Sequence, residues 1–225
     1  MREINREQVR ANLPELAMGI GINTGEVVVG NLGSQRRAKY GAVGTPINMT
    51  YRIESYTTGG QILISAATHE KVRTRVQVRQ TMEVQFKGMD RPLRLYDISG
   101  MEGDSTCTLA EVNGDPCIAL ETPLPIRYFL VEDKAVSQRA RAGFITHLLA
   151  SGARVTLEDK VPPYANLKIL LDPGRDPKLS DVYAKLVAIE EEGVVQSRIN
   201  GKLVFSFLPD DVRTFLDNKR SGSDS

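Results

Sequence analysis

The chain has 225 residues, of which 41% are hydrophobic and 25% are charged, a composition typical of an ordinary globular protein and not of a disordered or fibrous one. Its formal net charge of +1 argues against a dedicated nucleic-acid binder, and its two cysteines and two histidines lack the spacing of a zinc site or a disulfide scaffold. No apolar run approaches the roughly 20 residues that span a bilayer, and no secretory signal is visible, so we expect a cytoplasmic protein without direct membrane contact, either on its own or as the cytoplasmic part of a larger membrane-anchored protein.

The charge is unevenly distributed along the chain. Residues 1–100 hold 14 Lys and Arg against 9 Asp and Glu, whereas residues 101–225 hold 15 against 19. Glycine, proline and small polar residues dominate the stretch 101–122, which is typical of a linker. We therefore predict one domain over 1–100, a linker over 101–122 and a second domain over 123–220.

The first domain begins with a predicted amphipathic helix that starts at Glu3 and ends near Pro14, because apolar residues recur at near-helical spacing through residues 3–16. An apolar hairpin is expected next, with strands at 17–23 and 26–29 around a Thr24-Gly25 turn, lying in the core of a sheet. Residues 33–45 are polar and rich in glycine, so we expect irregular structure there.

A second helix is predicted over residues 47–56, with Pro46 in its first turn and Thr45 as its N-cap. The elements expected after it are a strand at 61–64, a short helix capped by Ser65 and running to about Val72, and strands at 83–87 and 93–98. Strands and helices alternate, which favours an α/β fold for this domain.

The second domain is dominated by short strand patterns separated by turn residues. The predicted strands are 126–131, 142–149, 153–157, 167–171, 182–189 and 203–207. A helix at 209–218 follows, with Asp210 and Asp211 at its positive end. This pattern predicts a small all-β barrel with a C-terminal helix.

One pair of side chains is a candidate for chemistry. Asn48 and Arg52 stand four residues apart on the predicted helix, which places them on one face. Arginine offers a planar cation suited to phosphate oxygens, and asparagine offers both a donor and an acceptor to a sugar. By itself, such a pair usually belongs to a solvated helix surface. The glycines of GIGINTG do not fit a dinucleotide-binding loop, and no phosphate-binding GxxxxGK[ST] motif occurs.

The sequence around Asn48 and Arg52 favours a functional role for the pair over a solvated helix surface. The string GIGINTGEVVVGNLGSQRRAKYGAVGTPINMTYRIESYTTGGQILIS resembles the second half of a class III adenylyl/guanylyl cyclase catalytic domain, and the similarity runs from about Leu16 to Ile98. The resemblance implies a ferredoxin-like sheet with helices and a homodimer. It also implies a reaction that converts ATP or GTP into a cyclic nucleotide and pyrophosphate for signal transduction.

The same resemblance implies roles for individual residues. Asn48 would orient the ribose and Arg52 would stabilise charge on the α-phosphoryl group, so both are candidate catalytic residues. Lys87 would hold the terminal phosphates, although an exposed lysine beside a turn glycine is an equally good interpretation. Gly41 stands where relatives place a Thr or Asp that reads the base, and because glycine has no side chain, the preference for adenine or guanine stays open.

The metal ions of this family pose a problem. Two aspartates bind Mg²⁺ or Mn²⁺ in class III cyclases, on an opening strand and hairpin that have no counterpart in this sequence. We therefore expect roughly half a catalytic domain, with no metal bound by residues of this chain and no activity unless the other half is supplied. With that half, the full protein would be a phosphorus-oxygen lyase.

The second domain resembles a degenerate PilZ-type barrel through the stretch RAGFITHLLASGARV and the later strands. Members that bind cyclic di-GMP carry an RxxxR arm and a [DN]xSxxG turn, whereas His147 and Leu149 stand here in place of the acid or amide and the serine. Arg139 and Arg141 are expected to be solvated. The leading hypothesis is a portion of a class III cyclase with an accessory barrel. The alternatives are a non-catalytic dimerisation or regulatory module and, less favoured, a cyclic di-GMP receptor.

Overall fold

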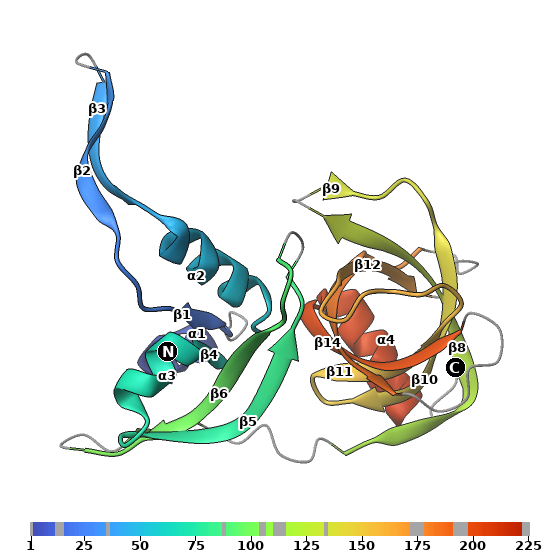
Figure 1. Ribbon diagram of the computed structural model, residues 1–225. Coiled ribbons are helices and arrows are strands. Elements are labelled where there is room, and N and C mark those ends of the chain that lie inside the picture. Colours follow the sequence, from blue (N-terminus) through green and yellow to red (C-terminus); the bar gives the residue numbers. More distant parts are fainter. Residues whose placement is uncertain are drawn as a thin grey trace. The chain divides into compact units, whose positions relative to one another are not determined.

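The computed structural model describes residues 2–11, 16–34, 37–86, 89–103, 107–109, 116–132, 135–171, 178–190 and 198–221. The chain divides into two compact units, residues 1–111 and residues 112–225 (Figure 1). No helix in these ranges is both long enough and apolar enough to cross a membrane.

Unit 1, residues 1–111, combines helices with a mixed sheet. Its elements are α1 (Arg2–Arg10), β1 (Ile20–Ile22), β2 (Val28–Ser34), β3 (Arg37–Val43), α2 (Thr45–Ser55), β4 (Ile62–Ser65), α3 (Ala66–Val72), β5 (Val76–Val84), β6 (Leu93–Met101) and β7 (Cys107–Thr108). The sheet order is β1-β4-β6-β5, with β7 paired to β6; β1 and β4 run parallel, and the other pairs are antiparallel.

The predicted hairpin of residues 17–23 and 26–29 is wrong. The segment at 20–22 pairs with β4 and not with the next strand, and residues 28–34 pair instead with residues 37–43. The resulting β2–β3 hairpin lies outside the main sheet and projects away from it (Figure 1). Residues 33–45, expected to be irregular, therefore contain a regular strand, and its partner is exposed and not in a core.

Other local predictions in unit 1 mostly hold. Helix α3 has Ser65 as its N-cap, whose hydroxyl accepts a hydrogen bond from the Thr68 backbone N–H at 3.2 Å. Helix α2 begins at Thr45, and its N-cap is Gly44 and not the predicted Thr45. Gly44 has φ 155° and ψ 158°, a conformation available essentially to glycine alone, so the backbone itself makes the turn from β3 into α2. The strand predicted at 83–87 coincides with β5 only at Glu83 and Val84, because β5 runs from Val76 to Val84; residue 87 lies outside the described residues.

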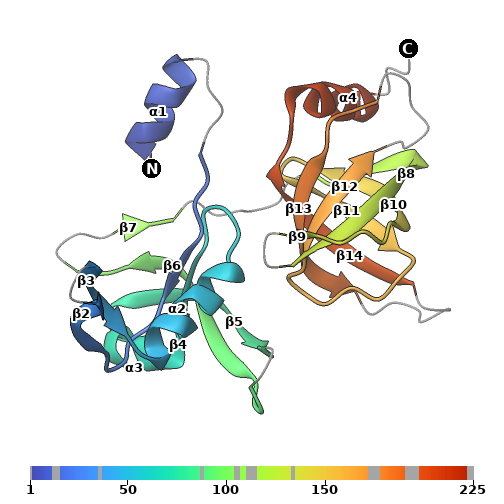
Figure 2. The ribbon, with the colours of Figure 1, turned by 90° about the horizontal axis from the view of Figure 1, so that it is seen from above.

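Unit 2, residues 112–225, is the predicted barrel. Its strands are β8 (Ile118–Glu132), β9 (Ala135–Val136), β10 (Arg141–Leu149), β11 (Gly152–Leu157), β12 (Asn166–Leu171), β13 (Val182–Glu190) and β14 (Ile199–Phe207), followed by α4 (Asp210–Arg220). The six strands β10-β11-β14-β13-β12-β8 close because β8 also pairs with β10, and every pair is antiparallel (Figure 2). The expected fold class, a mixed α/β region plus a closed six-stranded barrel with a C-terminal helix, is confirmed.

Apolar side chains are distributed very differently in the two units. Unit 2 contains a single core cluster, to which α4 contributes Val212, Phe215 and Leu216. Among the described residues, twenty buried hydrophobic residues belong to unit 2 and seven to unit 1, which are Ile53, Leu63, Ile64, Val84, Phe86, Leu95 and Ile98. Among the described large hydrophobic residues that stay exposed, fifteen belong to unit 1 and three to unit 2.

Candidate functional site

Helix α2 lies directly against the β1 segment because glycines leave room for it. A Cβ added at three positions of this segment would collide with α2 or with the turn after it. The closest approaches would be 2.0 Å between Gly19 and Thr57, 2.4 Å between Gly21 and Glu54, and 2.5 Å between Gly25 and Pro46. Real Cβ atoms do not approach other atoms this closely, so these glycines set the distance between strand and helix. The GxGxxxG spacing thus serves packing.

Polar contacts hold the N-terminal end of α2. The Asn23 side-chain amide donates to the Pro46 carbonyl oxygen at 3.0 Å, and the Thr50 hydroxyl donates to the same oxygen at 2.9 Å. The hydroxyls of Thr24 and Thr68 lie 3.0 Å apart and share a hydrogen bond. The loop after β1 therefore connects the first turn of α2 to the start of α3.

Asn48 and Arg52 both have exposed side chains on α2. Ile53 is fully buried and anchors the opposite side of the helix in the core of unit 1. Residues four apart on a helix are neighbours, with about 5–6 Å between their Cβ atoms. The structure therefore brings the amide and the guanidinium together on the outer face of α2, and neither is enclosed in the protein interior.

The C-terminal end of α2 packs against the segment that leads to Lys87. Tyr56 caps the helix, and its ring meets the ring of Phe86 edge-on with 4.9 Å between centroids. Phe86 is buried, and burial also raises the pKa of the Tyr56 hydroxyl. Lys87 itself lies outside the described residues. The residue before it, Phe86, packs on Tyr56, which lies one helical turn beyond Arg52.

Gly41 lies in β3, directly opposite Gly30 of β2. A Cβ at Gly41 would meet only the end of the Leu32 side chain, at 3.0 Å, and a Cβ at Gly30 would meet nothing within 4 Å. The paired glycines thus leave a place on the hairpin without side chains. Neither glycine has a positive φ, so a larger residue at position 41 is compatible with the backbone.

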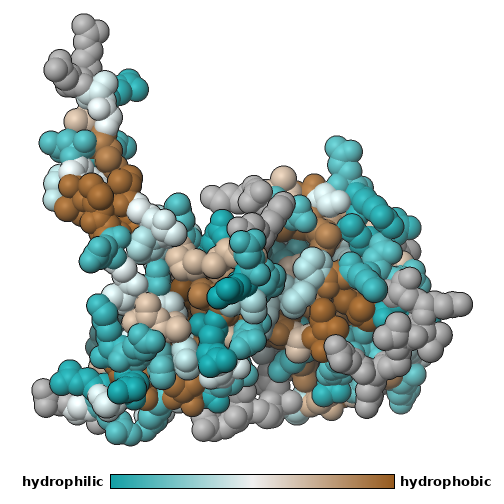
Figure 3. Space-filling view, in the orientation of Figure 1, coloured by the Kyte–Doolittle hydropathy of each residue, from teal (hydrophilic) through white to brown (hydrophobic). Residues whose placement is uncertain are grey.

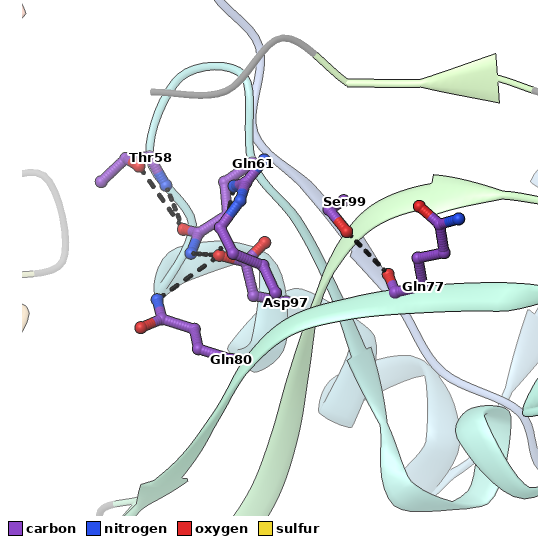
Figure 4. A network of polar contacts seen from close by, with 7 residues as sticks. Thr58, Gln61, Gln77, Gln80, Asp97 and Ser99 are labelled. Carbon is purple, nitrogen blue, oxygen red and sulfur yellow. Dashed lines mark hydrogen bonds and ion pairs between the residues drawn. The ribbon is translucent and has the colours of Figure 1, made fainter. Parts of the chain in front are cut away.

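A buried carboxylate organises the turn that follows α2 (Figure 4). Asp97 of β6 is 1% exposed, and its Oδ2 accepts from Gln61 at 3.0 Å, from Gln80 at 3.4 Å and from Arg79 at 3.4 Å. The Gln61 side-chain oxygen in turn accepts from the Thr58 backbone N–H at 3.1 Å. Strands β5 and β6 are therefore connected to the turn at the end of α2.

The described residues do not form a site for the divalent metals that the sequence resemblance implies. No group of three His, Cys, Asp or Glu side chains in those ranges could hold a metal ion. The Oδ1 atom of Asp97 has no hydrogen-bond partner among them, but the donors around this carboxylate are amides and a guanidinium, which disfavour a cation.

The positioning roles of Asn23 and Asp97 are not evident from local sequence. The local pattern places Asn23 at the end of a strand before a turn, and Asp97 within an ordinary strand. An asparagine ahead of a Thr-Gly pair, and an acid inside an apolar strand, are the signals that could have found them, because polar groups in such places need partners.

The comparisons with known proteins concern residues 1–100, which match the family model described as "Adenylate and Guanylate cyclase catalytic domain". Adenylate cyclase 1 of Rhizobium meliloti (strain 1021) is 30% identical over 103 residues, which are 45% of this chain and 16% of that protein. The uncharacterized protein Rv1318c of Mycobacterium tuberculosis (strain H37Rv) is 31% identical over 93 residues, 40% of this chain and 17% of that protein. The chain thus spans about a sixth of the length of these relatives.

Two solved structures are also similar. The guanylyl cyclase Cya2 shares 52% identity, with 48% of this chain and 55% of that chain covered and a TM-score of 0.46. The adenylyl cyclase CyaB from P. aeruginosa shares 32% identity over the same shares, with a TM-score of 0.40. The family match covers β1–β6 and helix α2 with its exposed pair. Residues 1–100 are therefore similar to the catalytic domain of adenylate and guanylate cyclases, and this similarity does not extend to the barrel that follows them.

Proposed function

We propose that the chain supplies the Asn48 and Arg52 side of a class III nucleotide cyclase site. In the reaction, the ribose 3′-oxygen forms a bond to the α-phosphorus of ATP or GTP, and the bond from that phosphorus to the bridging oxygen breaks. Pyrophosphate leaves, and the hydroxyl proton passes to solvent. Asn48 holds the ribose, and Arg52 neutralises charge on the α-phosphoryl oxygens.

The observation that carries this proposal is the exposed pair on a helix that packs closely against β1. Three glycine contacts and the Asn23 bond fix α2 on β1, so the two side chains are presented without further ordering of the backbone. A preorganised guanidinium in phosphoryl transfer can raise kcat by about 10³ to 10⁵. Loss of Arg52 should therefore remove nearly all turnover while the fold persists.

Lys87 and Gly41 complete the proposal on the substrate side. Lys87 would bind the terminal phosphates, and the packing of Phe86 on Tyr56 favours a position near the end of α2. Gly41 offers no group to a base edge, so ATP and GTP should be tested side by side. We place the activity in the cytoplasm, where both nucleotides are found.

Family members build their sites at a dimer interface, with metal ligands from one subunit and the Asn/Arg pair from the other. We propose that this chain pairs in the same way, as a homodimer or with a cyclase subunit that brings the metal-binding carboxylates. The 225-residue chain by itself should then give no cyclic nucleotide, because its described residues offer no set of metal ligands.

A complementation assay tests this proposal. The chain is mixed with an active class III cyclase subunit whose own transition-state arginine is replaced by alanine, so that this subunit alone is inactive. With Mn²⁺ and either nucleotide, the mixture should regain turnover, and Arg52→Ala should abolish it. Arg94→Ala is the matched control, because Arg94 is also an exposed arginine of unit 1, paired with Glu83 at 3.0 Å and far from α2 in sequence.

The outcomes separate the candidates. Turnover that survives Arg52→Ala would refute the proposed role. A second candidate, a non-catalytic dimerisation or regulatory module, is favoured by the exposed apolar residues of unit 1. It predicts that the two chains co-purify without turnover, and that fluorescent ATP and GTP analogues bind this chain equally well with and without Arg52.

For the barrel we propose a PilZ-like accessory role without cyclic di-GMP binding. A closed six-stranded barrel with a C-terminal helix supports the likeness. The expectation that Arg139 and Arg141 are both solvated is wrong for Arg141, which is only 15% exposed; both guanidiniums lie 3.2 Å from Oδ2 of Asp159. Arginines engaged by a carboxylate are poor phosphate ligands. Micromolar binding of cyclic di-GMP in titration calorimetry would overturn this view.

A further inference from the structure

Helix α2 presents a further side chain beside Asn48 and Arg52. Four exposed residues of this helix, at positions 48, 51, 52 and 55, have the spacing i, i+3, i+4 and i+7, which places them in one stripe along the helix. The Ser55 hydroxyl donates to the carbonyl oxygen of Arg52 at 2.7 Å, within the helix itself. Tyr51 is 70% exposed, so its ring takes little part in the packing of unit 1. The stripe therefore offers an aromatic ring to other molecules, next to the amide and the guanidinium.

The three side chains lie across the stripe in the same order as the parts of a nucleotide. With about 3.6 residues per turn, Tyr51 lies about 60° to one side of Asn48 around the helix axis, and Arg52 lies about 40° to the other side. In the proposed function, Asn48 holds the ribose and Arg52 faces the α-phosphoryl group. Because the base and the phosphates are attached at different ends of the ribose, a nucleotide held in this way extends its base toward Tyr51.

The hairpin that leads into α2 offers the edge of a base little hydrogen bonding. Gly41 has no side chain, and the two residues between it and the Gly44 cap, Ala42 and Val43, are apolar and exposed. Their partners across the ladder are valines, and hydrophobic side chains gather on this hairpin in Figure 3. The flat face of a base can be bound by an aromatic ring instead, and such stacking tolerates any base, because every base has a π-face.

We propose that Tyr51 is a substrate-binding residue, and that its ring stacks on the purine base of the nucleoside triphosphate. The site then holds the base by its face and accepts ATP and GTP alike. The inference rests on the proposed function, because it needs the ribose and the α-phosphoryl group to lie on Asn48 and Arg52. A base that stays stacked throughout the reaction stabilises the bound substrate and the transition state equally, so the contact lowers KM and leaves kcat nearly unchanged.

Steady-state kinetics of the complementation mixture test the contact. Tyr51→Ala should raise the KM for ATP and the KM for GTP by about 5- to 150-fold, the range that loss of one stacked base gives, and should change kcat by less than about threefold. Tyr51→Phe retains the ring and should retain the KM. Phe207→Ala is the matched control, because Phe207 is an aromatic residue of the barrel that is 58% exposed. An unchanged KM in Tyr51→Ala would overturn the inference, and so would a rise confined to one of the two nucleotides, since that would indicate a contact to a base edge.

Photo-crosslinking separates this inference from the proposed function, because it needs no turnover. 8-Azido-ATP carries its photoreactive group on the base, and tandem mass spectrometry of the irradiated mixture identifies the labelled residue. The label should fall on Tyr51, and an excess of ATP or of GTP should suppress it. Labelling of Tyr51 in a mixture without turnover would retain the base contact and refute the proposed function, whereas turnover that depends on Arg52 without labelling of Tyr51 would refute the base contact alone. Because the ring is exposed, Tyr51→Ala should melt at the same temperature as the unchanged chain, which excludes loss of folding as the cause of its effect.

Discussion

The contact between β1 and α2 can be tested by adding one methyl group. In Gly21→Ala the new Cβ would lie 2.4 Å from the backbone nitrogen of Glu54, 2.7 Å from its Cα and 2.9 Å from its Cβ. Two of these three atoms are helix backbone and cannot rotate away. Because ordinary contacts begin near 3.4 Å, the helix and strand must separate by about 1 Å.

The expected cost follows from overpacking, which typically destabilises a protein by about 1–3 kcal/mol. For a unit of this size, each kcal/mol lowers the melting temperature by about 4–8 °C. Gly30→Ala is the control, since nothing lies within 4 Å of a Cβ there. Thermal unfolding at one protein concentration, with exchange in α2 peptides as the local readout, measures both variants. If Gly21→Ala and Gly30→Ala have the same melting temperature, the close contact at Gly21 does not contribute to the packing of α2 on β1.

Three further predictions concern stability. Asp97→Ala should lower the free energy of unfolding, measured in urea, by about 1–3 kcal/mol, because the Gln61 donor and its neighbours lose their buried acceptor. Asp97→Asn retains one acceptor oxygen and should lower it less. Equal losses in the two variants would contradict this prediction. Ser65→Ala should remove about 1 kcal/mol by uncapping α3, and faster amide exchange in the first turn of α3 would show it. The Ser180 backbone N–H donates to the Asp211 carboxylate at 2.8 Å and lowers the pKa of Asp211 below its ordinary 3.8. The stability that this hydrogen bond gives the barrel is therefore present above pH 3.8 and is lost as the pH falls through the lowered pKa. In Asp211→Asn, the melting temperature of the barrel should fall less on acidification than in the unchanged protein.

The barrel was largely predictable from the sequence. Its strands alternate between inward apolar and outward polar residues, and its turns carry glycine, proline and charged residues, so local pattern and final structure agree. The N-terminal part of β8 was not predicted because Pro123 and Pro125 are typical of a linker. Both prolines nevertheless lie within the strand, where Pro125 stands opposite Phe144 of β10.

The first sheet was harder to predict because its partners are distant in sequence. The Thr24-Gly25 pair looks like a hairpin turn, but Thr24 bonds to Thr68 and Gly25 packs on Pro46, so the chain leaves the sheet there. Strand β1 has only three residues and pairs in parallel with β4. No local sequence pattern predicts this pairing. Local turn chemistry was overridden by tertiary contacts.

The candidate pair needed less of the tertiary structure. Helical spacing alone placed Asn48 and Arg52 on one face, and that arrangement depends only on the regularity of α2. What spacing could not supply is the support behind them, since Asn23 and the glycines act across more than twenty residues. Their catalytic role stays a prediction.

The closed ladder of the barrel limits how that unit can meet other molecules. Each of its six strands has neighbours on both sides, so its main-chain groups are largely engaged and strand addition has little to build on. Recognition by this unit has to come from the side chains on its outer wall and in its loops. Side chains at such positions can be replaced without disturbing the core, so the outer surface of the barrel can vary while its fold stays the same.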